Sequence, residues 1–404
     1  MIKKIAGVFS SNALGAGLGF LFNLMLARSC SVADYGEVMY FYTLLIVFVT
    51  VLDLGFANTI VVYPNKVGNG QIKETMHSII VFFNRYLIFI APLLLILLIG
   101  FRNLIGITLE ISFLLFTGTV LFLVYRINTS YQQGAGQWGK YNLLNIFNNL
   151  SKIGLFILFY LFWGSNIEYS SVVYIYVISS AILLLISWKF KDKAISRQKL
   201  QWSKLKTTLI PFALLNSITI LGVRLDIIFT KFFFTEHEIG IYAAANTLAL
   251  IFPVFSNALM SVLLKFSAEN SENITYFRQM FRHLKKLVPI VIILVLIAVF
   301  SVDFILPFFF GEKYNQAIPI FKILIVAFSG SIFILPLESL LLAKAEKQIV
   351  ILRFIQVPLQ FIVTYALKDY LGLYSIALGA FVARFFGWGI VVFLINKLYN
   401  KIKK

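Results

Sequence analysis

Long apolar stretches separated by short polar segments run through the whole of this 404-residue chain. A helix that spans a bilayer needs roughly 20 mostly apolar residues, and each stretch is about that long. The pattern predicts an all-α integral membrane protein with about twelve transmembrane helices. The predicted spans are residues 8–27, 38–63, 78–100, 107–125, 143–163, 170–188, 209–234, 239–264, 287–309, 318–342, 349–367 and 371–395.

Lys and Arg residues are distributed unevenly between the connections. With the N-terminus on the cytoplasmic side, 24 of them fall in inner connections and four in outer ones, namely Arg28, Arg102, Lys313 and Lys368. Cytoplasmic segments of membrane proteins carry such an excess of positive charge. We therefore expect both termini to be cytoplasmic, in a multi-pass protein of the cytoplasmic (inner) membrane surrounded by membrane lipids.

The longest inner connection, residues 189–208, is strongly basic and separates six predicted helices from six. The expected domains are an N-terminal six-helix lobe (1–188), a basic cytoplasmic linker (189–208) and a C-terminal six-helix lobe (209–404). The linker composition suits an amphipathic segment on the anionic inner leaflet, and a solvated loop is the alternative.

The first helix of each predicted lobe has a similar order of polar residues, which suggests an internal duplication. Asn12, Gly19, Asn23 and Arg28 fall opposite Asn216, Gly222, Asp226 and Lys231, at offsets of 204, 203, 203 and 203.

Composition excludes several other classes of protein. Hydrophobic residues make up 60% of the chain and charged residues 13%, whereas a soluble domain is nearer one-half and one-quarter. The net charge of +18 lies in short segments between apolar runs, so we expect no nucleic-acid partner. The three histidines are isolated, and we expect neither a metal site nor a cofactor.

Several motifs resemble the polysaccharide transporter family, which includes the Wzx-type flippases of O-antigen and capsule repeat units within the multidrug/oligosaccharidyl-lipid/polysaccharide (MOP) exporter superfamily. Residues 17–28 (Gly-Leu-Gly-Phe-Leu-Phe-Asn-Leu-Met-Leu-Ala-Arg) and 34–36 (Asp-Tyr-Gly) are similar to the family's opening. One departure is residues 29–31 (Ser-Cys-Ser), where the family more often has a Leu-Gly type of turn. Further matches are residues 53–57, 134–142, 224–226, 240–245 and 310–314.

The resemblance implies a fold and an activity. The fold is that of MOP and MATE-like transporters, with two six-helix lobes in a V and a cavity lined largely by helices one, two, seven and eight. The activity is translocation of undecaprenyl-pyrophosphate-linked oligosaccharide repeat units from the inner to the outer leaflet. The partners are that lipid-linked substrate and other polysaccharide assembly proteins.

Helix seven holds the main substrate candidates. Arg224 and Lys231 are seven residues apart, so they share one face. A guanidinium offers a bidentate fork to phosphate oxygens and a lysine supplies a point charge. They are therefore candidates to attract pyrophosphate or an acidic sugar, and an ion pair of Arg224 with Asp226 is the alternative.

Other polar residues of helices one, two, seven and eight are cavity candidates, although contacts between helices would also explain them. Asp53 and Asp226 are candidates for coupling to a proton or sodium gradient, with structural pairing to Lys152 or Arg384 as the alternative. The further substrate candidates are Arg28, Asn12, Asn23, Asn246 and Asn257.

The sequence is compatible with two other functions. A MATE-like multidrug or metabolite exporter is one, but the predicted helices hold seven basic and four acidic residues, which favours an anionic substrate. A membrane polymerase or ligase would need reactive groups in a sizeable outer loop. The outer connections are short, so we expect a transporter rather than an enzyme.

Overall fold

The computed structural model describes residues 2–67, 72–164, 167–190, 202–254, 256, 274–344 and 346–403, and this part of the chain is helical without any strand. It forms two compact units, one of Met1–Phe22 with Tyr40–Leu221 and the other of Asn23–Met39 with Gly222–Lys404. Three helices contribute residues to both units. They are α1 (Ile2–Ser29), α2 (Val32–Leu52) and α8 (Trp202–Phe233).

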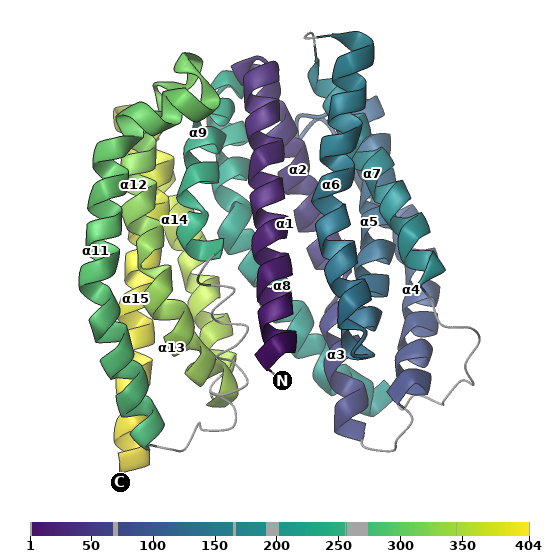
Figure 1. Cartoon of the computed structure of the whole chain (residues 1–404), viewed down its shortest axis with the longest axis vertical. Coiled ribbons are helices and arrows are strands. Elements are labelled where there is room, and N and C mark those ends of the chain that lie inside the picture. Colours follow the sequence, from purple (N-terminus) through teal and green to yellow (C-terminus); the bar gives the residue numbers. More distant parts are fainter. Residues whose placement is uncertain are drawn as a thin grey trace. The chain divides into compact units, whose positions relative to one another are not determined.

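In the first unit, α5 is the central helix and packs against α3, α4, α6 and α7 (Figure 1). The Thr108 side chain caps the start of α5 by accepting a hydrogen bond from the Ile111 amide. The helices that lie wholly within this unit are α3 (Phe56–Val67), α4 (Ile72–Gly100), α5 (Leu109–Gly134), α6 (Trp138–Trp163) and α7 (Tyr169–Lys189).

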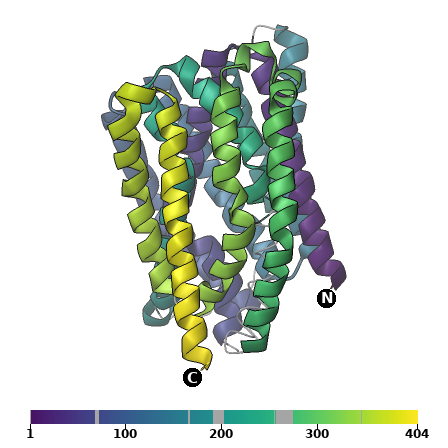
Figure 2. The same ribbon diagram turned by 90° about the vertical axis from the view of Figure 1, so that its left-hand side faces the viewer.

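In the second unit, α15 packs against α12, α13 and α14, and α12 also contacts α9 and α11. Figure 2 shows these helices from the side, with α15 in yellow. The elements are α9 (Glu236–Ala249), α11 (Ile274–Phe310), the 3-10 turn η1 (Glu312–Tyr314), α12 (Ala317–Ser329), α13 (Ser331–Lys344), α14 (Glu346–Leu371) and α15 (Tyr374–Lys403).

The helices have the length and surface of membrane spans. Among the described residues, eleven are long and apolar enough to cross a bilayer. Large side chains such as Phe300 and Phe304 on α11 are 79% and 76% exposed, which suits a face turned to lipid rather than water. The predicted all-α membrane fold is confirmed. The predicted span 239–264 lies partly outside the described residues, and the orientation of the termini stays a prediction.

The predicted span 38–63 is not one helix. It consists of α2 and α3, and the chain turns at Leu54 and Gly55, which have φ angles of 44° and 76°. A Cβ atom on Gly55 would lie 2.7 Å from the Ala213 amide nitrogen of α8. This close approach of two backbones needs glycine and explains the break.

Two further predicted segments can be compared with the structure. The predicted span 318–342 matches the candidate span Ala317–Leu341, within which a turn at Gly330 separates α12 from α13. Helix α8 begins at Trp202 rather than at 209, so residues 202–208 of the predicted linker are helical, and residues 191–201 lie outside the described part. The division into lobes at 188 and 209 stays a prediction.

Candidate functional site: the repeat junction

The two halves of the sequence meet inside the second unit. We call the contacts of residues 23–39 with residues 222–249 and 308–314 the repeat junction. At its centre α2 crosses α9 so closely that a Cβ on Gly36 would lie 2.2 Å from the Glu236 carbonyl oxygen, and one on Gly240 would lie 2.0 Å from that of Val32. Any larger residue at either glycine would force the helices apart.

This crossing is symmetric in sequence. Gly36 and Gly240 are 204 residues apart, and so are Val32 and Glu236. Each glycine faces the carbonyl that corresponds to the one facing its counterpart. The offset equals one of those found between the first helices of the two halves, so the duplication inferred from polar residues also appears as a reciprocal contact.

Helix ends are joined across the junction. The last carbonyl groups of a helix lack partners within it. Arg28 donates from Nε to the Phe309 oxygen at 2.8 Å and also bonds the Phe308 oxygen, at the end of α11. In return Lys313 donates to the Cys30 oxygen at 2.5 Å and Tyr314 to the Ala27 oxygen at 3.2 Å, at the end of α1. The family-like segments 17–28 and 310–314 therefore contact each other.

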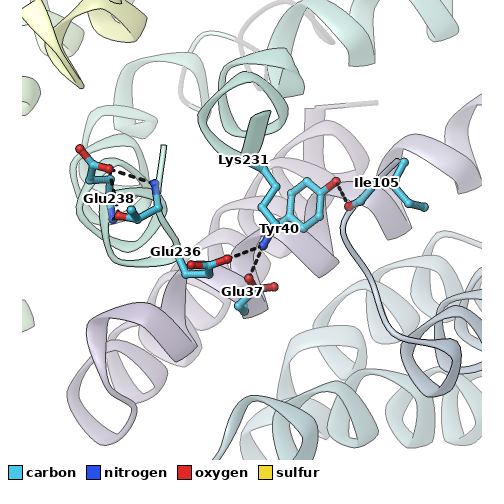
Figure 3. A network of polar contacts seen from close by, with 7 residues as sticks. Glu37, Tyr40, Ile105, Lys231, Glu236 and Glu238 are labelled. Carbon is cyan, nitrogen blue, oxygen red and sulfur yellow. Dashed lines mark hydrogen bonds and ion pairs between the residues drawn. The ribbon is translucent and has the colours of Figure 1, made fainter. Parts of the chain in front are cut away.

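A charge cluster lies beside the crossing (Figure 3). The Lys231 ammonium on α8 bonds the Glu37 carboxylate on α2, and it lies 2.9 Å from Glu236 Oε1 at the start of α9. We call these three residues the ion triad. Lys231 holds the pKa of Glu236 below its ordinary value. Thr235 and Glu238 form a capping box that fixes the start of α9.

Two of the cations predicted to bind substrate are therefore bonded to other groups of the same chain. Arg28 bonds helix carbonyls and Lys231 bonds two carboxylates. Arg224 lies half-buried two turns before Lys231 on α8. A role for these three cations in substrate binding stays a prediction.

Asp226 is 1% exposed and is held by neutral donors. It accepts hydrogen bonds from the Tyr242 hydroxyl and the Ile227 amide, both at 2.9 Å. Arg384 lies within electrostatic range of this carboxylate, and its guanidinium stacks 4.2 Å over the Phe328 ring. The alternative of structural pairing between Asp226 and Arg384 is thus consistent with the geometry.

Asp53 has a different partner from the two that the sequence suggested. It lies at the break between α2 and α3, fully buried, and accepts from the Ala57 amide at 3.0 Å. Its other oxygen is 3.7 Å from Arg126 on α5. Its charged neighbour is thus Arg126 rather than Lys152 or Arg384, the two residues named in the structural alternative, because the predicted spans assigned Arg126 to a loop.

The asparagine candidates are not gathered in one place. Asn12 on α1 accepts from Asn145 on α6 at 3.5 Å, within the first unit. Asn23 is half-buried in the second unit. Asn246 on α9 is 3% exposed, and its amide oxygen accepts no hydrogen bond from the described residues. Asn257 lies outside the described residues.

A row of polar residues on α6, at positions 142, 145, 149 and 152, was not among the predicted site residues. Their spacing of three, four and three residues was visible in the sequence and places them on one helix face. The sequence alone did not show that this face contacts α1. In the part of the chain that the structure describes, no three His, Cys, Asp or Glu side chains lie close enough together to hold a metal ion.

Comparison with known proteins identifies the family. A family model described as polysaccharide biosynthesis protein matches residues 1–266. The chain belongs to this family. It is also similar to an uncharacterized membrane protein of Haemophilus influenzae, 24% identical over 259 residues, which is 62% of this chain and 61% of that protein. The match thus spans about three-fifths of that relative.

Solved structures of MOP-superfamily transporters have the same fold. An inward-facing multidrug resistance MATE transporter matches with a TM-score of 0.74 and 15% identity, over 96% of this chain and 95% of that one. The lipid II flippase MurJ matches with a TM-score of 0.75 and 16% identity, over 100% and 90%. A MOP transporter from Pyrococcus furiosus, described as having a binding pocket of reverse polarity, gives 0.72 and 14%, over 100% and 96%. The predicted family and the MATE-like fold are confirmed.

Proposed function

We propose that the protein is a flippase that moves undecaprenyl-pyrophosphate-linked oligosaccharide repeat units from the inner to the outer leaflet of the cytoplasmic membrane, for O-antigen or capsule assembly. Membership of the polysaccharide biosynthesis family supports this. Further support comes from the shared fold with a flippase of a lipid-linked substrate.

The repeat junction is the observation that carries the mechanism. Transport by alternating access needs a set of contacts that closes the transport path on one side of the membrane and that forms and breaks together. The junction has this character, because the ion triad, the glycine crossing and the helix-end contacts join the same few helix ends. Water can replace its polar contacts when it opens, which keeps the cost of opening moderate.

In the predicted orientation the junction lies on the outer side of the membrane. Its opening would release the substrate to the outer leaflet, and its closure would prevent leakage while the substrate enters from inside. Arg224, two turns inward from the ion triad on α8, is the residue we expect to meet the pyrophosphate. Asp53 and Asp226 are our candidates for coupling to a proton or sodium gradient, and other polysaccharide assembly proteins are the expected partners.

Flipping can be tested with the purified protein in liposomes that contain a fluorescent undecaprenyl-pyrophosphate oligosaccharide on one leaflet. We expect the intact substrate to appear on the other leaflet, as measured by its accessibility to a membrane-impermeant glycosidase. Arg224→Ala should abolish transfer without lowering protein abundance, and Arg224→Lys should keep part of it because the charge remains. Cleavage of the glycosyl bond would indicate an enzyme, and efflux of cationic drugs without flipping would indicate a multidrug exporter.

Orientation has its own test. A phosphatase domain fused after Thr235 should be active outside the cytoplasm, and one fused after Phe190 should be inactive. The reverse pattern would contradict the predicted topology and place the repeat junction on the inner side.

A further inference from the structure

A polar face of α6 runs along α1 inside the first unit. Asn142 accepts from the Ser11 hydroxyl at 2.9 Å, Asn145 donates to Asn12 at 3.5 Å, and Asn149 donates to the Gly15 carbonyl at 2.7 Å. Polar side chains in a membrane protein are placed against protein or a wet path, because lipid cannot bond them. We call Ser11, Asn12, Asn142, Asn145 and Asn149 the polar ladder.

Lys152 stands at the end of this ladder, near the middle of α6. It is 6% exposed. Its ammonium lies 5.7 Å from the Tyr42 ring centroid and 5.4 Å from that of Tyr176. The two rings stack at 5.2 Å, and Phe22 packs edge-on against Tyr176 at 5.7 Å. We call Lys152 and the rings of Tyr42, Tyr176 and Phe22 the lysine cage. Tyr42 is the one partly exposed member of this set.

The described residues supply no counter-charge to Lys152. Two other cations of the described helices do have carboxylate partners, Arg126 in Asp53 and Arg353 in Glu338. Lys152 makes neither an ion pair nor a hydrogen bond with the described residues. Its ammonium instead lies over the rings of Tyr42 and Tyr176. Cation–π contacts offset part of the free-energy cost of burying an ammonium, but they offset less of it than a paired anion does.

We propose that Lys152 and the polar ladder form an anion-binding carbohydrate subsite in the first unit. Its ligand is the negatively charged part of the cargo, either the carboxylate of an acidic sugar or the diphosphate of the lipid carrier. This subsite rests on the proposed function and names the substrate class that the flippase accepts.

The chemistry of the two parts is complementary. Side-chain amides of the ladder donate to and accept from sugar hydroxyls. The ammonium binds anionic oxygens by charge-assisted hydrogen bonds. Tyr42, the partly exposed ring of the cage, has the flat apolar surface against which a sugar ring can pack. A cationic drug would gain nothing here, because the cage already holds a cation.

The test measures ligand-induced thermal stabilisation of the purified full-length protein in detergent. The probes are D-glucuronate, inorganic pyrophosphate and, as the neutral control, D-glucose. We expect at least one anionic probe to raise the unfolding temperature and glucose to have no effect. Lys152→Met should weaken the binding of that probe by at least about tenfold, as loss of a charge-assisted bond predicts.

The matched control is Lys140→Met, which removes a lysine from the same helix that also lies over an aromatic ring, that of Phe190. It should bind the probe as the wild type does. Stabilisation by glucuronate alone would assign the site to an acidic sugar, and by pyrophosphate alone to the lipid carrier. If Lys152→Met does not fold, Lys152→Gln gives the same comparison, because it also removes the charge.

No stabilisation by either anion, or equal stabilisation of Lys152→Met, would overturn the subsite. That failure can be separated from failure of the proposed function, because flipping by the wild type is measured in liposomes without these probes. A wild type that flips substrate while Lys152→Met flips equally well would retain the function and refute the subsite.

Discussion

Lys231 and Lys152 both lie in predicted membrane spans, but their surroundings are opposite. The Lys231 side chain, 14% exposed, bonds two carboxylates beside a close helix crossing. Lys152, 6% exposed, has two tyrosine rings and no carboxylate among the described residues. One lysine therefore stabilises the fold through its charge, and the other has a charge that the fold does not neutralise.

The contrast separates two uses of a buried cation. A pair that is broken on one side leaves an uncompensated charge and costs about 3–5 kcal/mol, so Lys231 is suited to hold a closure that opens as a unit. A cation–π contact contributes about 0.5–2 kcal/mol, which leaves Lys152 ready for an anion that comes and goes. Stability measurements on matched variants can test this difference.

The largest effect is expected at the helix crossing that supports the ion triad. Gly240→Ala would place a Cβ atom 2.0 Å from the Val32 carbonyl oxygen, and the backbones would have to separate. We expect a loss of about 3 kcal/mol in the free energy of unfolding, measured by denaturant titration in detergent.

Gly154→Ala is the control for this change, because a Cβ there meets no atom within 4 Å. It should be neutral or slightly stabilising, since alanine favours helix. A fully stable Gly240→Ala protein would mean that the close crossing is not required for the junction.

The ion triad should give the next largest effect. Lys231→Glu places three carboxylates together, and we expect a loss of about 2 kcal/mol and reduced flipping. Adding Glu37→Lys should restore much of both, because the exchanged pair has opposite charges again. Absence of rescue in the double variant would show that Lys231 acts on something other than Glu37.

Removal of the unpaired charge should have the opposite sign. Lys152→Met keeps the apolar stem and deletes the ammonium, so we expect the protein to be stabilised by about 1 kcal/mol while losing anion binding. Lys231→Met, measured in parallel, should be destabilised. Destabilisation of both variants by the same amount would remove the distinction between the two lysines.

Much of the fold could be predicted from the sequence, because hydrophobicity along the chain directly reports spans. The break at Asp53 could not, since it depends on the approach of Gly55 to Ala213 in a distant helix. The repeat offset was visible in polar residues of α1 and α8, and the structure adds the contact that it produces at Gly36 and Gly240.

The candidate site was predicted less well, because partners are not local in sequence. Lys231 was identified by its charge and by the helix face that it shares with Arg224, but its carboxylate partners lie on α2 and at the start of α9. Lys152 was noted solely as a partner for an aspartate. Its spacing from Asn142, Asn145 and Asn149 was readable, whereas the facing α1 and the absence of a neighbouring acid required the structure.

The smallest effect concerns Glu236, the exposed member of the ion triad. Lys231 lowers the pKa of Glu236 below its ordinary value of 4.5, first by its hydrogen bond and then by its charge. A carboxyl group whose pKa is lower in the folded protein contributes stability above the unfolded pKa and loses it as the pH falls through the folded pKa. The difference in stability between wild type and Glu236→Gln should therefore be small but constant near neutral pH, and should vanish as the pH falls below about 4.5. Because the side chain is 51% exposed, salt should reduce the difference as well. Glu168→Gln, at the start of α7 where the side chain makes no capping bond, controls for the loss of one surface carboxylate. If the stability difference between wild type and Glu236→Gln instead grows as the pH falls, Glu236 is not paired with Lys231. Glu37 would then be the sole carboxylate partner of Lys231 at the repeat junction.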